Sequence, residues 1–109
     1  MTPLPAPQLE HIADLTVQVA APIEAGQVAG LNSRGRRRII PITGGLLTGP
    51  RLHGRVLPGG ADFQLVVSST TADLDARYLL ALEGPEFGGE HIFVQNRALR
   101  RGAADDIAK

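Results

Sequence analysis

Polar residues with the chemistry for ligand binding or proton transfer recur on strand-like segments of the sequence: Asp62, Asp75, Arg77 and Asn96. A carboxylate can act as a general base, a guanidinium can stabilise an oxyanion, and an amide can orient a polar ligand. Because these residues come from three strand-like segments with apolar neighbours, we expect them to converge inside a barrel wall. The hypothesis is a common ligand pocket, with Thr43 and Tyr78 at its margin.

An alternative interpretation applies to Asp75 and Arg77. In an alternating strand they share one face with Leu79, opposite Leu74 and Tyr78. Charged residues that alternate along a strand ordinarily face solvent, where an ion pair adds little stability. For Tyr78, a phenol packed over a barrel opening with its hydroxyl at the rim is as good an interpretation as a ligand contact.

Glycine pairs and prolines divide the sequence into short apolar runs rich in Ile, Val, Leu and Thr, which favours strands. We expect strands over residues 9–20, 37–43, 46–57, 62–69, 72–82 and 91–96, a loop over 22–33, and a helical tail over 98–109. Residues 72–82 also have the composition of a short amphipathic helix, but turn clusters on both sides favour a strand. Gly44-Gly45 permits a sharp bend or bulge.

The fold class is therefore all-β, with an antiparallel meander that forms a small β-barrel or half-barrel and a short C-terminal helix. The alternation predicts that the following residues are mostly buried: Leu15, Val17, Val19, Ile40, Ile42, Val56, Leu65 and Val94.

Composition bounds the function classes. A length of 109 residues indicates a single domain over 1–109, and eleven basic against eleven acidic residues give a net charge of zero. No general field attracts nucleic acid or an anionic membrane, so we expect neither partner. The chain has no cysteine, no apolar run long enough to span a bilayer, and no signal-peptide pattern in residues 1–8, so we expect a soluble, cytoplasmic protein.

No metal or cofactor is expected. The three histidines, at 11, 53 and 91, form no close ligand pair. The basic cluster of Arg34, Arg36, Arg37 and Arg38 lacks interleaved aromatic residues and is interpreted as a solvated strand entrance. The glycine pairs do not match a phosphate-binding loop, and no GxSxG elbow is present.

Several ordered motifs carry a family resemblance: the run at 38–45 (RIIPITGG), Gly49-Pro50, Gly54, the run at 58–62 (PGGAD), the run at 74–78 (LDARY) and the run at 94–97 (VQNR). In these motifs the chain resembles the bacterial family called domain of unknown function 3237, over roughly residues 9–101. The resemblance implies an antiparallel β-barrel and brings no settled activity. It also implies further barrel-closing strands, whereas this chain stops at Lys109.

An unpaired sheet edge and zero net charge together predict self-association, at least into a dimer. Two functions from different classes remain. The first is a binding protein that holds a small metabolite in its lumen. The second is a cofactor-free isomerase, cyclase or lyase that acts by proton transfer, with Asp62 or Asp75 as base and Arg77 as oxyanion stabiliser. A structural fragment that serves only assembly is a third possibility.

Overall fold

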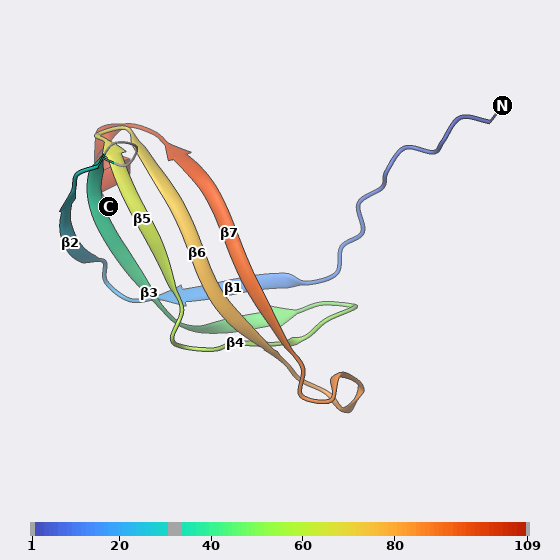
Figure 1. The fold of residues 1–109 in the computed structure, drawn as a ribbon. Helices are drawn as coiled ribbons and strands as arrows, with labels where there is room; N and C mark the ends of the chain where they lie inside the picture. Colours follow the sequence, from blue (N-terminus) through green and yellow to red (C-terminus); the bar gives the residue numbers. More distant parts are fainter. Residues whose placement is uncertain (1, 31–33, 109) are drawn as a thin grey trace.

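The computed structural model describes residues 2–30 and 34–108. These residues form an antiparallel sheet of seven strands, followed by one short helix (Figure 1). The strands are β1 (Asp14–Val19), β2 (Ile23–Val28), β3 (Gly35–Thr48), β4 (Gly54–Val56), β5 (Ala61–Ser68), β6 (Thr71–Leu82) and β7 (His91–Arg101). A 3-10 turn, Pro85–Phe87, precedes β7, and the helix α1 spans Ala104–Ala108.

Two long strands organise the sheet. The first half of β3 pairs with β2 and β5, and its second half pairs with β1 and β4. Strand β6 pairs with β5 and β4 and, along almost its whole length, with β7. Figure 1 shows β1 and β4 crossing the lower parts of β6 and β7, so that the sheet curls round on itself. The architecture fits the predicted barrel or half-barrel.

The bend in β3 lies at the glycine pair. The pairing with β1 shifts between Gln18–Gly44 and Val19–Ile42, which leaves Thr43, next to the glycine pair, as the bulged residue. Gly45 has φ 148°, and a Cβ there would collide with the carbonyl oxygen of Thr16. Only glycine fits such a position. The predicted bend is confirmed, although one continuous strand passes through it in place of two strands.

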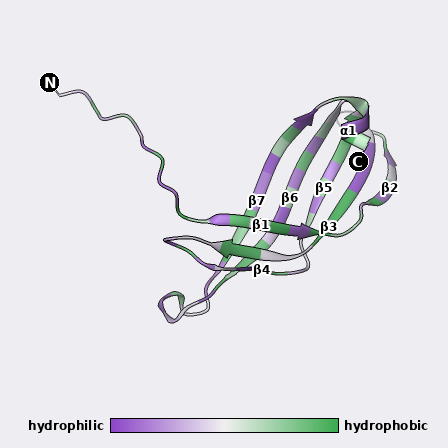
Figure 2. Cartoon of the chain, turned by 180° about the vertical axis from the view of Figure 1, so that it is seen from behind, coloured by the Kyte–Doolittle hydropathy of each residue, from purple (hydrophilic) through white to green (hydrophobic). Residues whose placement is uncertain are grey.

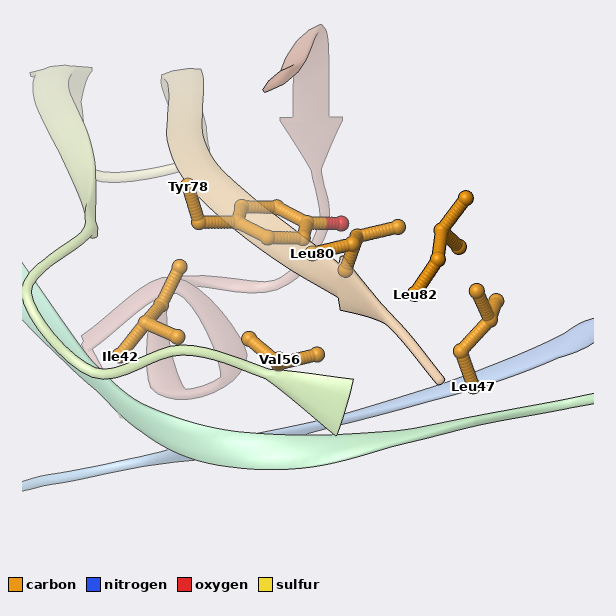
Figure 3. Close-up of a cluster of buried hydrophobic side chains, with 6 residues drawn as sticks. All are labelled: Ile42, Leu47, Val56, Tyr78, Leu80 and Leu82. Carbon is orange, nitrogen blue, oxygen red and sulfur yellow. The ribbon is translucent and has the colours of Figure 1, made fainter. Parts of the chain in front are cut away.

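The main core fills the space between β6 and the β3–β4 region (Figure 3). Its buried members are Ile42, Leu47, Val56, Tyr78, Leu80 and Leu82. Even-numbered residues of β6 supply one wall, because alternate side chains of a strand point to the same face. We call this face of the sheet the inner face and the opposite one the outer face.

A second core cluster holds the helix against the sheet. Ile107, which is 1% exposed, packs with Val66 and Ala72, and Leu74 borders the cluster. Figure 2 shows α1 at the end of the sheet formed by β5 and the start of β3, where green apolar bands alternate with purple polar ones along the strands. The helix therefore covers one end of the inner face.

Several details of the sequence-based assignment are wrong. The expected strand over 46–57 is two segments, the end of β3 and the short strand β4, because the chain turns at Gly49-Pro50 between them. Strand β2 occupies part of the expected loop, of which residues 31–33 lie outside the described part. Strand β7 continues to Arg101, so the helix is shorter than expected. Leu15 and Val19 were expected to be buried, but they are 42% and 57% exposed, because β1 pairs only with β3 among the described strands and carries little cover.

Ile42, Val56 and Leu65 are buried as expected, while Val17, Ile40 and Val94 are partly buried. Within residues 2–30 and 34–108, no helix has the length and apolar character needed to cross a membrane.

Candidate functional site

A row of four directly paired residues crosses the inner face. Asp62 on β5 pairs with Ile40 on β3 and with Ala76 on β6, and Ala76 in turn pairs with Asn96 on β7. Directly opposed residues of antiparallel strands project to the same side of the sheet. The ladder therefore brings an acid and an amide, distant in sequence, to one face.

A hollow of about 240 Å³ lies over this row. Its lining is mostly apolar and contains three groups able to form side-chain hydrogen bonds; the full set is Val17, Val19, Ile40, Ile42, Asp62, Ala76, Tyr78 and Asn96. Ligand sites commonly combine an apolar wall with a few polar groups that fix orientation. Three of the six predicted site residues, Asp62, Tyr78 and Asn96, are therefore brought together.

Tyr78 is buried, with 7% of its surface exposed. Burial raises the pKa of its phenol above the usual value. The group therefore stays neutral at physiological pH, and its hydroxyl can donate a hydrogen bond.

The Asp62 carboxylate is held from two sides. The Gln64 side-chain amide donates to its Oδ2 over 2.8 Å, and the backbone N–H of Asp75 donates to its Oδ1 over 3.1 Å. A carboxylate offers about four acceptor positions, so both oxygens keep capacity for a further donor. Asp62 is thus fixed in place while still able to meet a ligand.

Behind Gln64 lies a buried cation. Arg38 is 1% exposed, and its Nε and Nη2 donate to Gln64 Oε1 over 2.9 and 2.6 Å. Its Nη1 donates to the carbonyl oxygen of Ala108 over 3.4 Å, which links the sheet to α1. We call Arg38, Gln64 and Asp62 the inner polar chain. A single amide separates the guanidinium from the carboxylate.

Asp75 and Arg77 lie on the outer face. Arg77 Nη2 donates to Asp75 Oδ2 over 2.9 Å, and the Gln95 amide donates to Asp75 Oδ1 over 3.2 Å. The hydrogen bond from Arg77, followed by that from Gln95, lowers the pKa of Asp75 below its usual value. The Arg77 side chain is 52% exposed. The expected convergence of this pair with Asp62 is wrong, because positions 75 and 77 have the opposite parity in β6 from Ala76.

Each of these two residues borders a different hollow. Asp75 lines one of about 160 Å³ with Arg37, Asp73 and Arg97. Arg77 lines one of about 260 Å³ with Phe93 and the turn at 58–60.

Thr43 lies in the bulged part of β3 and is exposed. Its hydroxyl donates to the carbonyl oxygen of Gln18 over 3.3 Å. It does not line the hollow that contains Asp62. A ligand role for any of the six residues stays a prediction.

The sequence analysis did not identify the burial of Arg38 or the hydrogen bond by which Gln64 holds Asp62. The sequence placed Arg38 in a solvated basic cluster, which is wrong for this residue, although Arg34 is exposed. The available signal was parity: Arg38 alternates with Ile40 and Ile42, and therefore shares their inner face.

In the described part of the chain, no three histidine or acidic residues lie close enough together to hold a metal ion. His53 packs edge-on against Phe87, with ring centroids 5.5 Å apart, and Nε2 of His11 lies 2.9 Å from Asp14 Oδ1. The predicted lack of a metal stays a prediction.

Comparisons with known proteins identify relatives without an assigned activity. The chain is 36% identical to a UPF0311 protein from Clostridium acetobutylicum over 91 residues, which cover 84% of this chain and 53% of that protein. It is 36% identical to a UPF0311 protein from Bradyrhizobium diazoefficiens over 101 residues, 93% of this chain and 60% of the relative. The chain therefore spans about half to two thirds of the length of these relatives.

Solved structures show the same fold. A crystal structure of a protein of unknown function from Clostridium acetobutylicum superposes with a TM-score of 0.73 at 34% identity, covering 91% of this chain and 60% of that one. A β-barrel-like protein from Acinetobacter baumannii superposes with a TM-score of 0.68 at 36% identity, covering 95% and 64%. The model of the family "Protein of unknown function (DUF3237)" matches residues 7–109. The bulged antiparallel sheet, the shared sequence and this match lead to one conclusion: the chain belongs to the DUF3237 family.

Proposed function

We propose that the protein binds a small metabolite in the hollow of its inner face. The observation that carries the proposal is the meeting of Asp62, Tyr78 and Asn96 on an otherwise apolar wall. The apolar side chains supply contact area, and the three polar groups supply orientation. We propose the cytoplasm as the compartment, because a chain without cysteine suits a reducing environment.

Native mass spectrometry of protein purified from its host tests this proposal. We expect a co-purifying small molecule with the unaltered chain and its loss from Ala76→Phe, which places a large ring in the hollow. The matched control is Ala81→Phe, since Ala81 is also on β6 but has outer-face parity. Retention of the molecule by Ala76→Phe, or its loss from both variants, contradicts binding in this hollow.

The proton-transfer alternative depends on Asp62 alone. Asp75 has a lowered pKa and is engaged by Arg77, so it makes a poor base, and Arg77 is directed away from the hollow. Asp62→Asn distinguishes the two functions. A binding protein keeps part of its affinity, whereas an isomerase, cyclase or lyase that uses this base loses turnover of the co-purified molecule.

We also propose a second copy of this chain as partner, paired along β7. Glu90 and Gly102, which flank β7, are hydrogen-bonded through their backbones to Leu82 and Thr70 on the β6 side. Even-numbered residues of β7 therefore direct their backbone N–H and C=O groups toward β6. Odd-numbered residues therefore direct their N–H and C=O groups outward, and β7 has no second neighbour among the described strands. An antiparallel pairing centred on Asn96 places Phe93 opposite the partner's Leu99.

Phe93 and Leu99 are 62% and 71% exposed, so this register would bury two large apolar side chains from each copy. Sedimentation equilibrium tests it. Leu99→Lys should shift the chain toward monomer, while Val67→Lys, at a 46% exposed position of the interior strand β5, should not. A stable monomer of the unaltered chain at high micromolar concentration contradicts the proposal.

A further inference from the structure

We propose that the inner hollow selects a ligand with a protonated amine on an apolar body. This inference rests on the proposed binding function and adds the chemical class of the ligand. Among the eight residues that line the hollow, Asp62 alone carries a formal charge. The site therefore presents one carboxylate to a ligand.

The buried cation does not cancel this preference at the ligand's position. Arg38 lies behind Gln64, donates to Gln64 and to Ala108, and does not line the hollow. A ligand in the hollow therefore contacts Asp62 and not Arg38. A second carboxylate brought beside Asp62 would be repelled, whereas an ammonium would form a charge-assisted hydrogen bond.

The walls suit the two ends of such a ligand. Tyr78 contributes an aromatic ring to the same hollow as Asp62, and a cation near an aromatic face is stabilised by the ring quadrupole. The apolar body can contact Ile40 and Ile42 along with the two valines of β1. Asn96 is exposed, and its side-chain amide oxygen can accept a hydrogen bond from one of the ammonium N–H groups.

Three probes of similar shape and different charge test the inference: 2-phenylethylammonium, 2-phenylethanol and phenylacetate. Nitrogen-15 NMR titration reports binding through the Asn96 side-chain amide and the backbone of Ala76. We expect the ammonium to bind about tenfold more tightly than the alcohol, because a hydrogen bond to a charged partner is stronger. We expect phenylacetate to leave both signals unchanged.

Asp62→Asn is the decisive variant, and Asp75→Asn on the outer face is its control. Asp62→Asn should bring the affinities for the ammonium and the alcohol within about twofold of each other, while Asp75→Asn preserves the difference. The comparison of the three probes on the unaltered chain stands even if Asp62→Asn fails to fold.

The outcomes separate the two proposals. Equal binding of the ammonium and the alcohol at these signals overturns the amine preference and leaves small-molecule binding in place. Binding of phenylacetate more tightly than the ammonium also overturns the amine preference and leaves small-molecule binding in place. The absence of a response to any probe at millimolar concentration overturns the amine preference. Loss of the co-purified molecule from both Ala76→Phe and Ala81→Phe independently overturns the proposed site.

Discussion

Two charged groupings lie back to back on the sheet and differ in almost every physical respect. On the inner face, the inner polar chain joins a buried guanidinium to a carboxylate through one amide. On the outer face, two ion pairs, Asp75–Arg77 and Asp73–Arg97, lie at the surface with half or more of each arginine side chain exposed. We call the latter the outer ion pairs.

The contrast shows that the two faces of one sheet can carry charge with different consequences. Arg38 must be satisfied by protein groups because water does not reach it, and loss of a partner leaves a buried polar atom unpaired. The outer ion pairs exchange protein partners for water at little cost. The charged residue of the inner face is therefore needed for the stability of the fold, whereas the outer ion pairs can be altered at little cost in stability.

The largest expected effect comes from uncovering the inner polar chain. Ile107→Ala removes a fully buried side chain that anchors α1, and we expect a loss of about 3 kcal/mol in the free energy of unfolding. Urea unfolding measures it. The matched control Ile23→Ala, at a 53% exposed position, should shift the midpoint much less. Equal shifts would mean that the helix adds no cover.

Arg38→Met should follow in size. It leaves Gln64 Oε1 without its two guanidinium donors, and we expect a loss of about 2–3 kcal/mol. Pairing it with Gln64→Leu should restore part of this loss, because apolar packing then replaces an incomplete polar network. Arg77→Met is the outer-face control and should leave the urea midpoint near that of the parent chain. A midpoint that falls as far for Arg77→Met as for Arg38→Met would erase the distinction between the faces.

The smallest expected effect is electrostatic. Arg77→Gln should raise the pKa of Asp75, because the Arg77 hydrogen bond is the main cause of its lowering. Carbon-13 NMR titration of the carboxyl measures this. Arg97→Gln, which acts on Asp75 only through space, should raise the pKa less. A larger effect of Arg97→Gln would contradict the assigned cause.

The same pair fixes a direction for pH dependence. The pKa of Asp75 is lower in the folded chain than the usual 3.8, so its stabilising contribution is present above that value and is lost as the pH falls through the folded-state pKa. In Arg77→Gln this part of the acid dependence should diminish. Thermal unfolding between neutral and strongly acidic pH measures the change.

Local pattern was enough to predict most of the sheet. Turn clusters bounded β5 and β6 correctly, since proline and glycine mark turns through the backbone alone. The polar stretch of β2 was missed, because nearly all its side chains are exposed and its pairing with β3 needs no apolar alternation.

The candidate site was only half predictable. Parity within β6 separates Asp75 from Ala76, but which parity faces inward depends on the curl of the whole sheet. The even positions turned out to be inner, which kept Asp62 and Asn96 with Tyr78 and moved Asp75 and Arg77 to the other side. Burial of Arg38 depends on cover from α1, a contact between residues far apart in sequence.

The bend that lets β3 serve both halves of the sheet also bears on how the chain assembles. Strands β5, β6 and β7 are consecutive in the sequence and are joined by short connections. The paired residues nearest these connections are Ser68 with Thr71 and Ala81 with His91. The three strands can therefore pair with little loss of loop entropy. The pairing of β3 with β1 and β5 instead joins distant parts of the chain. Docking of β3 is therefore the slow step that we expect to limit the folding rate.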